Sequence, residues 1–185
     1  RVLDAAVMAE LPPLKMEKAK FVTEIKPLAE SDWSERGSDA VCFTVATNPS
    51  SPQGQLSKIA SGGELARFML ALKVNLAQKS SVETLVFDEV DSGIGGATAQ
   101  AVGERLFRLA QKVQVLVVTH SPQVAAFSNE HFKVSKATEN NVTLTRVEKL
   151  SGDEKKEEIA RMLSGEKISD EARAAAEVLI NCRNQ

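Results

Sequence analysis

The sequence of 185 residues is poor in the residue types that mark several common classes of protein. It has no tyrosine, one tryptophan and 4% aromatic residues overall, so few side chains could stack on the bases of a single-stranded nucleic acid. Its two cysteines, Cys42 and Cys182, lie far apart and lack the paired spacing of metal ligands. Neither a disulfide framework nor a zinc site is therefore predicted.

Long apolar runs and a basic excess are also missing. No stretch approaches the ~18 apolar residues of a membrane span, and residues 1–10 show no signal-peptide pattern, so we expect a cytoplasmic protein without a membrane partner. The 23 basic and 25 acidic residues give a net charge of −2. The densest basic pair, Lys155-Lys156, lies among acids. The basic stripe of a dedicated DNA-binding domain is absent.

The first part of the chain is predicted to be a helix followed by two strands. Apolar residues recur at helical spacing over residues 1–13 until Pro12-Pro13 ends the pattern. Because the pattern begins at the first residue, we expect the end of a longer coiled-coil helix. Residues 14–57 then contain strands at 19–25 and 40–47 and a loop leading into the main domain.

Residues 58–150 alternate between helical and strand patterns, with 43% hydrophobic residues in the whole chain to form a core. The expected elements are a helix at 65–76, a strand at 85–87, a helix at 102–113 and a strand at 115–118. Since both strands are apolar throughout, they predict an α/β fold: a parallel βαβ core with helices on both faces. Segments 132–135 and 142–147 predict an antiparallel hairpin at its edge.

Residues 151–185 are predicted to form two C-terminal helices. Ser151 and Glu154 have the spacing of a capping box at the start of the first helix. Ser169 is the expected cap of the second helix, with acidic residues in its first turn.

Two adjacent carboxylates, Asp88 and Glu89, follow the first buried strand, Leu85–Phe87. Ligands of parallel sheets bind beyond the carboxyl ends of the strands. In nucleotide hydrolases such a pair places the Asp near Mg²⁺ and the Glu near the attacking water. The alternative interpretation is a plain strand followed by an acidic turn.

Ser61-Gly-Gly-Glu64 opens the helix at 65–76. Its spacing fits an ordinary capping box, with Ser61 as cap. The same glycine-led helix start also exposes free N–H groups to which a phosphate could bind. Both interpretations remain open for this motif alone.

His120 follows the second buried strand, at the sheet edge expected to hold Asp88 and Glu89. A histidine at a strand end is often only structural. At this edge it could instead contact a terminal phosphate or the attacking water.

The order of these three features resembles the C-terminal half of an ABC-type ATPase head. Ser61–Glu64 resembles the signature motif, Leu85–Glu89 the Walker B strand, Asp91–Gly96 the D-loop and His120 the switch histidine. Four longer runs resemble the bacterial RecN family of SMC-like DNA repair ATPases across nearly the whole chain. They are Ile59-Ala-Ser-Gly-Gly-Glu-Leu-Ala-Arg67, Phe87-Asp-Glu-Val-Asp-Ser-Gly-Ile-Gly-Gly96, Thr119-His-Ser-Pro-Gln-Val-Ala-Ala126 and Glu157-Glu-Ile-Ala-Arg-Met-Leu163.

This resemblance implies roles for single residues in a dimer of two heads that encloses ATP. Glu89 is expected to activate water and His120 to sense the γ-phosphate, while Asp88 holds Mg²⁺, usually through water. The signature and D-loop residues are expected to face the ATP of the partner head; they are Ser61, Gly62, Gly63, Glu64 and Asp91. The implied process is DNA double-strand break repair and recombination, with DNA engaged by the parent protein and a location at the nucleoid.

One family motif is missing from this sequence. The phosphate-binding Walker A pattern, Gly-x-x-x-x-Gly-Lys followed by Ser or Thr, does not occur. We therefore expect the second half of a split head, inactive alone and dependent on an N-terminal lobe that carries the Walker A loop. The alternatives are the same half of another SMC-like head or of an ABC transporter domain, and a non-enzymatic docking module. Retention of both Asp88 and Glu89 argues against the docking module.

Overall fold

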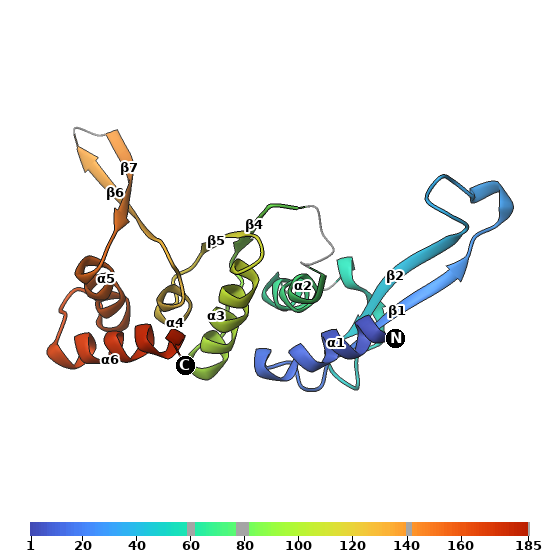
Figure 1. Cartoon of the computed structure of the whole chain (residues 1–185), viewed down its shortest axis with the longest axis horizontal. Helices are drawn as coiled ribbons and strands as arrows, with labels where there is room; N and C mark the ends of the chain where they lie inside the picture. Colours follow the sequence, from blue (N-terminus) through green and yellow to red (C-terminus); the bar gives the residue numbers. More distant parts are fainter. Residues whose placement is uncertain (59–61, 77–81, 140–141, 185) are drawn as a thin grey trace.

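The computed structural model describes residues 1–58, 62–76, 82–139 and 142–184, and it places the helices in a row along one side of an elongated chain (Figure 1). Helix α1 (Val2–Glu10) ends in a short 3-10 turn, Pro12–Leu14, as the two prolines predicted. Strands β1 (Lys20–Pro27) and β2 (Asp39–Ala46) pair antiparallel, and a two-residue strand, β3 (Gly54–Gln55), joins β2. The two predicted strands are confirmed, whereas β3 was too short to recognise in the sequence.

The central part contains helix α2 (Gly62–Leu76), strand β4 (Thr84–Asp88), helix α3 (Gly96–Ala110), strand β5 (Gln114–Val118) and the short helix α4 (Pro122–Ala126). Strands β4 and β5 are parallel neighbours, with Asp88 opposite Val118. The parallel βαβ core is thus confirmed. Helix α4 was read in the sequence only as part of a motif, because five residues are too few to show helical spacing.

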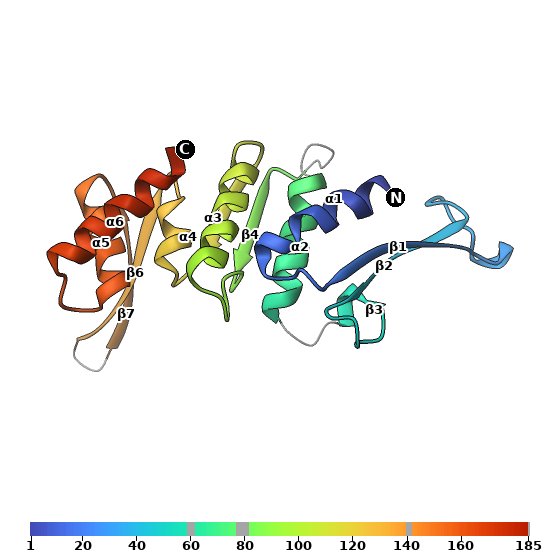
Figure 2. The ribbon, with the colours of Figure 1, turned by 90° about the horizontal axis from the view of Figure 1, so that it is seen from below.

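The helix layer covers only one face of the β4–β5 pair, unlike the prediction of helices on both faces. Figure 1 shows β4 and β5 on one side of α3, and Figure 2 shows β4 between α2 and α3 when the chain is seen from below. On the opposite face, Val86, Leu116 and Val118 are 67%, 49% and 62% exposed. We call these three residues the open face. Their apolar character is typical of a strand buried on both sides, but in the described part of the chain these side chains stay about half or more exposed.

An ion pair joins α1 to the far end of α3. The carboxylate of Glu10 accepts a hydrogen bond from Nε of Arg105 at 2.9 Å and lies 3.5 Å from NH2 of Arg108. Arg105 is buried and also donates to the carbonyl oxygen of Ala101. Since both partners of the Glu10–Arg105 pair are largely removed from water, the pair fixes the two helices against each other.

The C-terminal part consists of a hairpin, β6 (His131–Glu139) with β7 (Val142–Leu150), followed by helices α5 (Asp153–Ser164) and α6 (Asp170–Asn181). Strands β6 and β7 are the predicted hairpin, longer than expected. Helices α5 and α6 pack on α4 around a small second core of mostly alanine side chains and Ile159.

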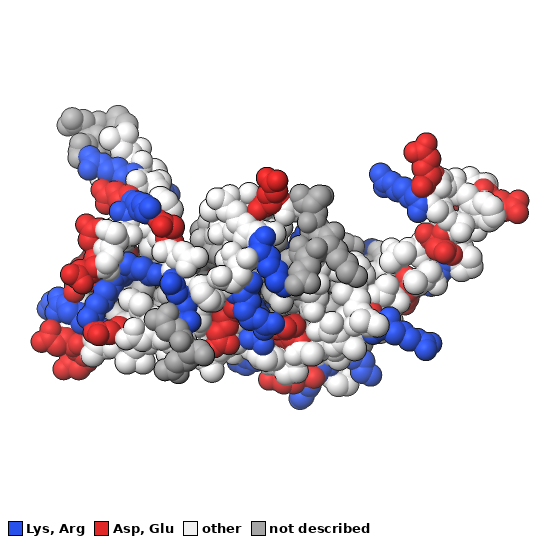
Figure 3. Space-filling model, viewed as in Figure 1, with Lys and Arg blue, Asp and Glu red and all other residues white. Residues whose placement is uncertain are grey.

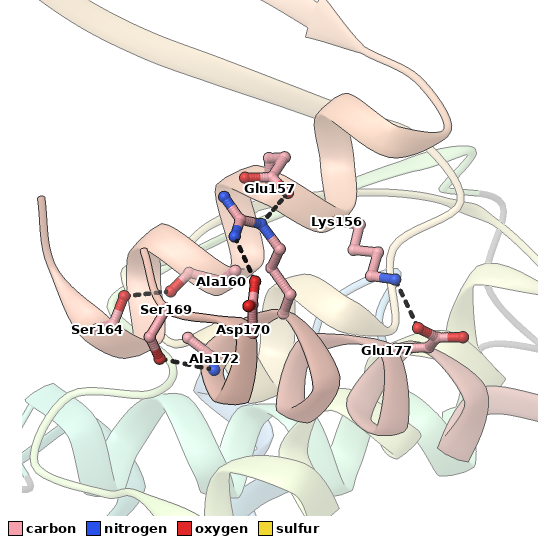
Figure 4. A network of polar contacts seen from close by, with 9 residues as sticks. Lys156, Glu157, Ala160, Ser164, Ser169, Asp170, Ala172 and Glu177 are labelled. Carbon is pink, nitrogen blue, oxygen red and sulfur yellow. Dashed lines mark hydrogen bonds and ion pairs between the residues drawn. The ribbon is translucent and has the colours of Figure 1, made fainter. Parts of the chain in front are cut away.

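Figure 4 shows the polar contacts between the last two helices. The Ser169 hydroxyl accepts the Ala172 N–H at 3.3 Å, so Ser169 is the predicted cap of α6. The prediction for α5 was only partly right. Glu154 accepts the Ser151 N–H at 3.1 Å, but the cap residue is Gly152, which adopts φ +50°.

Packing of α3 on α4 predicts a stability loss for Gly103→Ala. A Cβ at Gly103 would lie 2.5 Å from Cδ2 of Phe127, which is buried. Overpacking costs ~1–3 kcal/mol, and the better helix propensity of alanine returns about 1 kcal/mol. We expect a net loss of about 1 kcal/mol in the free energy of unfolding, measured by urea denaturation. Gly54→Ala is the control, since its Cβ would meet no atom within 4 Å; equal stability of the two variants would contradict this packing.

Candidate ATP site at the strand ends

Asp88 and Glu89 lie exposed at the carboxyl end of β4, where the sequence predicted a strand-end pair. Asp88 is the last residue of the strand. Glu89 adopts φ +55°, a left-handed conformation that is unusual for a residue with a side chain. Such a conformation costs ~1–2 kcal/mol and directs the chain sharply out of the strand, and such strain is concentrated at functional sites.

Asp91 lies inside the chain. It is 0% exposed, and its Oδ2 accepts hydrogen bonds from the Thr119 hydroxyl and, at 3.2 Å, from the Ser121 N–H. The sequence had placed this residue toward the ATP of a partner head. Here its carboxylate instead joins the loop after β4 to the loop after β5.

His120 is exposed and stands between the two residues that contact Asp91. Ser121 caps α4, because its hydroxyl oxygen accepts the Val124 N–H at 3.4 Å. The Ser121 N–H also donates to Oγ1 of Thr119 at 3.0 Å. The sequence analysis did not identify Thr119 and Ser121 as site residues, although two hydroxyl residues flanking a histidine could have indicated hydrogen bonds that hold its loop.

The start of α2 lies against the loop after β4. A Cβ at Gly63 would come 3.0 Å from the carbonyl oxygen of Ser92, so a glycine allows this close approach. Gly62 is exposed and Glu64 half-buried at the helix start, whereas the predicted phosphate contact Ser61 lies outside the described residues. The signature segment and the strand-end loops therefore meet at one edge.

Arg67, one turn into α2, was not predicted as a site residue. It is buried, its Nη1 lies 3.5 Å from the Ser92 carbonyl oxygen, and its Nε has no hydrogen-bond partner in the described part of the chain. Burial lowers the pKa of the Arg67 guanidinium, and the charge of Glu64 acts in the opposite direction.

The exposed Asp88 carboxylate fits a Mg²⁺ that is also held by waters and substrate phosphates, rather than a metal site built of protein ligands alone. Among the residues that the structure describes, no three or more His, Cys, Asp or Glu side chains gather in a way that could hold a metal ion. Mg²⁺ is usually held by one or two carboxylates together with waters and substrate phosphates. Asp88 is suited to that arrangement, because its carboxylate is exposed at the edge of the sheet.

One face of the molecule has a mixed charge. Figure 3 shows acidic and basic side chains interspersed on the face it presents, without a broad basic stripe. In the described part of the chain, no helix combines the length and the apolar character needed to cross a membrane.

Comparison with curated proteins finds similar sequences among DNA repair proteins named RecN. The protein from Rickettsia prowazekii is 43% identical over 178 residues, which are 96% of this chain and 32% of that protein. The proteins from Streptomyces coelicolor and Bacillus subtilis are 42% and 40% identical, each over 95% of this chain. The similarity that the motifs predicted is confirmed, and the chain spans about a third of the length of these relatives.

Solved structures of SMC heads share the fold. The Smc head domain from Pyrococcus yayanosii matches with a TM-score of 0.61 at 17% identity, over 88% of this chain and 29% of that one. A structure from a study of ATP-driven dimerization and DNA-stimulated activation of SMC ATPases matches with a TM-score of 0.51 at 15% identity, over 89% of this chain and 93% of that one. No family model matches the chain. The predicted α/β class, with the fold of an SMC-type head, is confirmed.

Proposed function

We propose that this chain is the C-terminal part of a RecN-like ATPase head, which hydrolyses ATP where two heads meet. The observation that carries the proposal is the arrangement at one sheet edge. Asp88 ends β4 and Glu89 follows it, His120 follows the parallel neighbour β5, and the glycine-led start of α2 packs on the loop after β4. This combination of groups suits phosphoryl transfer to water.

Each residue has a part in that reaction. Glu89 accepts a proton from the water that bonds to the γ-phosphorus, while the bond to the bridging oxygen breaks and ADP and phosphate form. His120 contacts the γ-phosphate, and Asp88 helps to hold Mg²⁺. When bound, Mg²⁺ offsets negative charge on the β- and γ-phosphate oxygens. Gly62, Gly63 and Glu64, with Ser61, offer the N-terminus of α2 to the ATP of the partner head.

Asp91 contributes to the head–head contact through its loop. Because its carboxylate is buried, exposed residues of the same loop, such as Ser92 and Gly93, would reach a partner directly. Asp91 itself holds the loop in place from inside.

The open face is an observation in favour of the proposed N-terminal partner lobe. Three apolar side chains on adjacent parallel strands are exposed there, an arrangement typical of a surface that another part of a protein covers. The sequence has no Walker A motif, and relatives are about three times as long. We propose that the lobe carrying the Walker A loop seats on Val86, Leu116 and Val118 and completes the site.

The parent protein would act in the cytoplasm on DNA, in double-strand break repair and recombination, and a second copy of its head would complete the dimer. Relatives named as DNA repair proteins support this role. The mixed charge of this chain supports a DNA contact elsewhere in the parent protein.

The test is ATP hydrolysis by this chain alone and mixed with the separately purified remainder of its parent protein. We expect hydrolysis in the mixture and none above background from either part, because the phosphate cradle and the Glu89 edge lie on different segments. Hydrolysis by this chain alone would overturn the split-head proposal. A mixture that forms a complex without hydrolysing ATP would overturn the assigned activity and leave only the association of the two parts supported.

A further inference from the structure

A buried carboxylate connects the two loops of the candidate site. Asp91 is fully buried, and its Oδ2 receives the Thr119 hydroxyl and the Ser121 N–H. Its other oxygen, Oδ1, is also buried and has no hydrogen-bond partner among the described residues. Burying a carboxylate is costly unless donors compensate for the lost water. These two donors are therefore strong restraints on the loop after β5.

These hydrogen bonds act on the two residues on either side of His120. Thr119 is fixed through its side chain and Ser121 through its backbone, so both neighbours of the histidine are tied to one carboxylate. The Ser121 N–H is shared between Asp91 and Thr119, which closes a small ring of hydrogen bonds. The peptide units on either side of His120 consequently have little freedom, while its imidazole remains exposed.

The same carboxylate lies next to the contact with α2. Ser92, the neighbour of Asp91, receives the close approach of Gly63 and the contact from Arg67. A continuous set of contacts thus leads from the start of α2 through Ser92 and Asp91 to Thr119. A shift of the α2 N-terminus against Ser92 would displace the carboxylate that holds the histidine.

We propose that Asp91 and Thr119 are positioning residues that hold His120 in place for ATP hydrolysis. Neither residue is assigned contact with the reacting atoms; both act through His120. This inference rests on the proposed ATPase function for the role of the histidine. The restraint on the loop itself does not depend on that function.

The experiment uses the full-length parent protein with Thr119→Val, Thr119→Ser and Asp91→Asn. Hydrogen exchange of the Ser121 amide, without nucleotide, measures the restraint on the loop. We expect Thr119→Val to speed this exchange by about tenfold or more, the effect of losing one hydrogen bond to a charged group, and Thr119→Ser to restore it. Thr143→Val is the matched control, because Thr143 lies exposed on β7.

The kcat and KM of steady-state ATP hydrolysis measure whether His120 is held in its working position. We expect Thr119→Val to lower kcat about tenfold or more with KM within about twofold, Thr119→Ser to recover most of it, and Asp91→Asn to act like Thr119→Val. In a His120→Ala background, Thr119→Val should add no further loss. Thermal unfolding of each variant separates these effects from loss of the fold.

Each outcome decides a different point. Unchanged exchange in both Thr119→Val and Asp91→Asn would overturn the restraint. Faster exchange with an additive loss of kcat in the His120→Ala background would overturn positioning through the histidine. A wild-type protein that does not hydrolyse ATP, or a His120→Ala variant with full activity, would overturn the catalytic part and trace the failure to the proposed function.

Discussion

In the full-length parent protein, Glu89→Gln is expected to lower kcat for ATP hydrolysis by at least about 100-fold, because a positioned general base contributes ~10²–10⁴-fold. Glutamine keeps the shape of the side chain but cannot accept the proton of the attacking water. Glu89 lies exposed just beyond Asp88, on a left-handed turn at the end of β4. ATP binding should persist, so the ATP-bound dimer should live longer, as measured by size-exclusion chromatography after ATP addition.

Glu83→Gln is the matched control for this prediction. It makes the same chemical change on an exposed residue just before the opposite end of β4, so hydrolysis should stay within about twofold of wild type. If Glu89→Gln leaves both the rate and the dimer lifetime unchanged, Glu89 is not the base. A loss of rate accompanied by loss of ATP binding would assign the residue to binding instead.

Leu116→Glu is expected to weaken association of this chain with the remainder of its parent by at least about 100-fold. Leu116 lies at the middle of β5 on the open face and is 49% exposed. If the N-terminal lobe covers it, a glutamate there becomes a buried, unpaired charge that costs several kcal/mol, and about 1.4 kcal/mol is tenfold in Kd. The Kd is measured by isothermal titration of the two purified parts.

The fold of this chain should tolerate Leu116→Glu, because the side chain already faces water. Its midpoint of urea unfolding is therefore expected to stay close to that of the wild type. Val178→Glu on α6 is the control, since Val178 is apolar and 63% exposed and its helix packs on α4 and α5. Equal Kd values for both variants would show that the lobe seats elsewhere.

Much of the fold could be predicted from local patterns, and the corrections concern contacts that local patterns do not contain. The apolar run Leu85–Phe87 identified β4, but a continuous run cannot tell which part of a protein will cover each face. In the described chain, Phe87 is buried on the helix side while Val86 faces outward. Under the proposed function, the outward apolar face of β4 is the one that the N-terminal lobe would cover.

In the candidate site, too, local patterns predicted some features, and others depend on contacts between distant residues. The residue types at the strand ends predicted the edge at which Asp88, Glu89 and His120 would lie, and the pairing of β4 with β5 places them there. The orientation of Asp91 depends on Thr119, a residue 28 positions away, and no spacing rule reports such a contact. At α5, the left-handed backbone of Gly152 moved the cap by one residue from the expected Ser151.

The ion pair of Glu10 with Arg105 and Arg108 connects α1 to the C-terminal half of α3. Helix α3 has 15 residues and is therefore about 22 Å long. At one end it starts at Gly96, directly after the loop that contains Asp91, and near the other end Arg105 and Arg108 contact Glu10. Because α1 bonds to α3 near this distant end and also packs on α2, where Asn75 contacts the Ala6 carbonyl oxygen, a displacement of α1 would act on both helices whose N-termini lie at the candidate site.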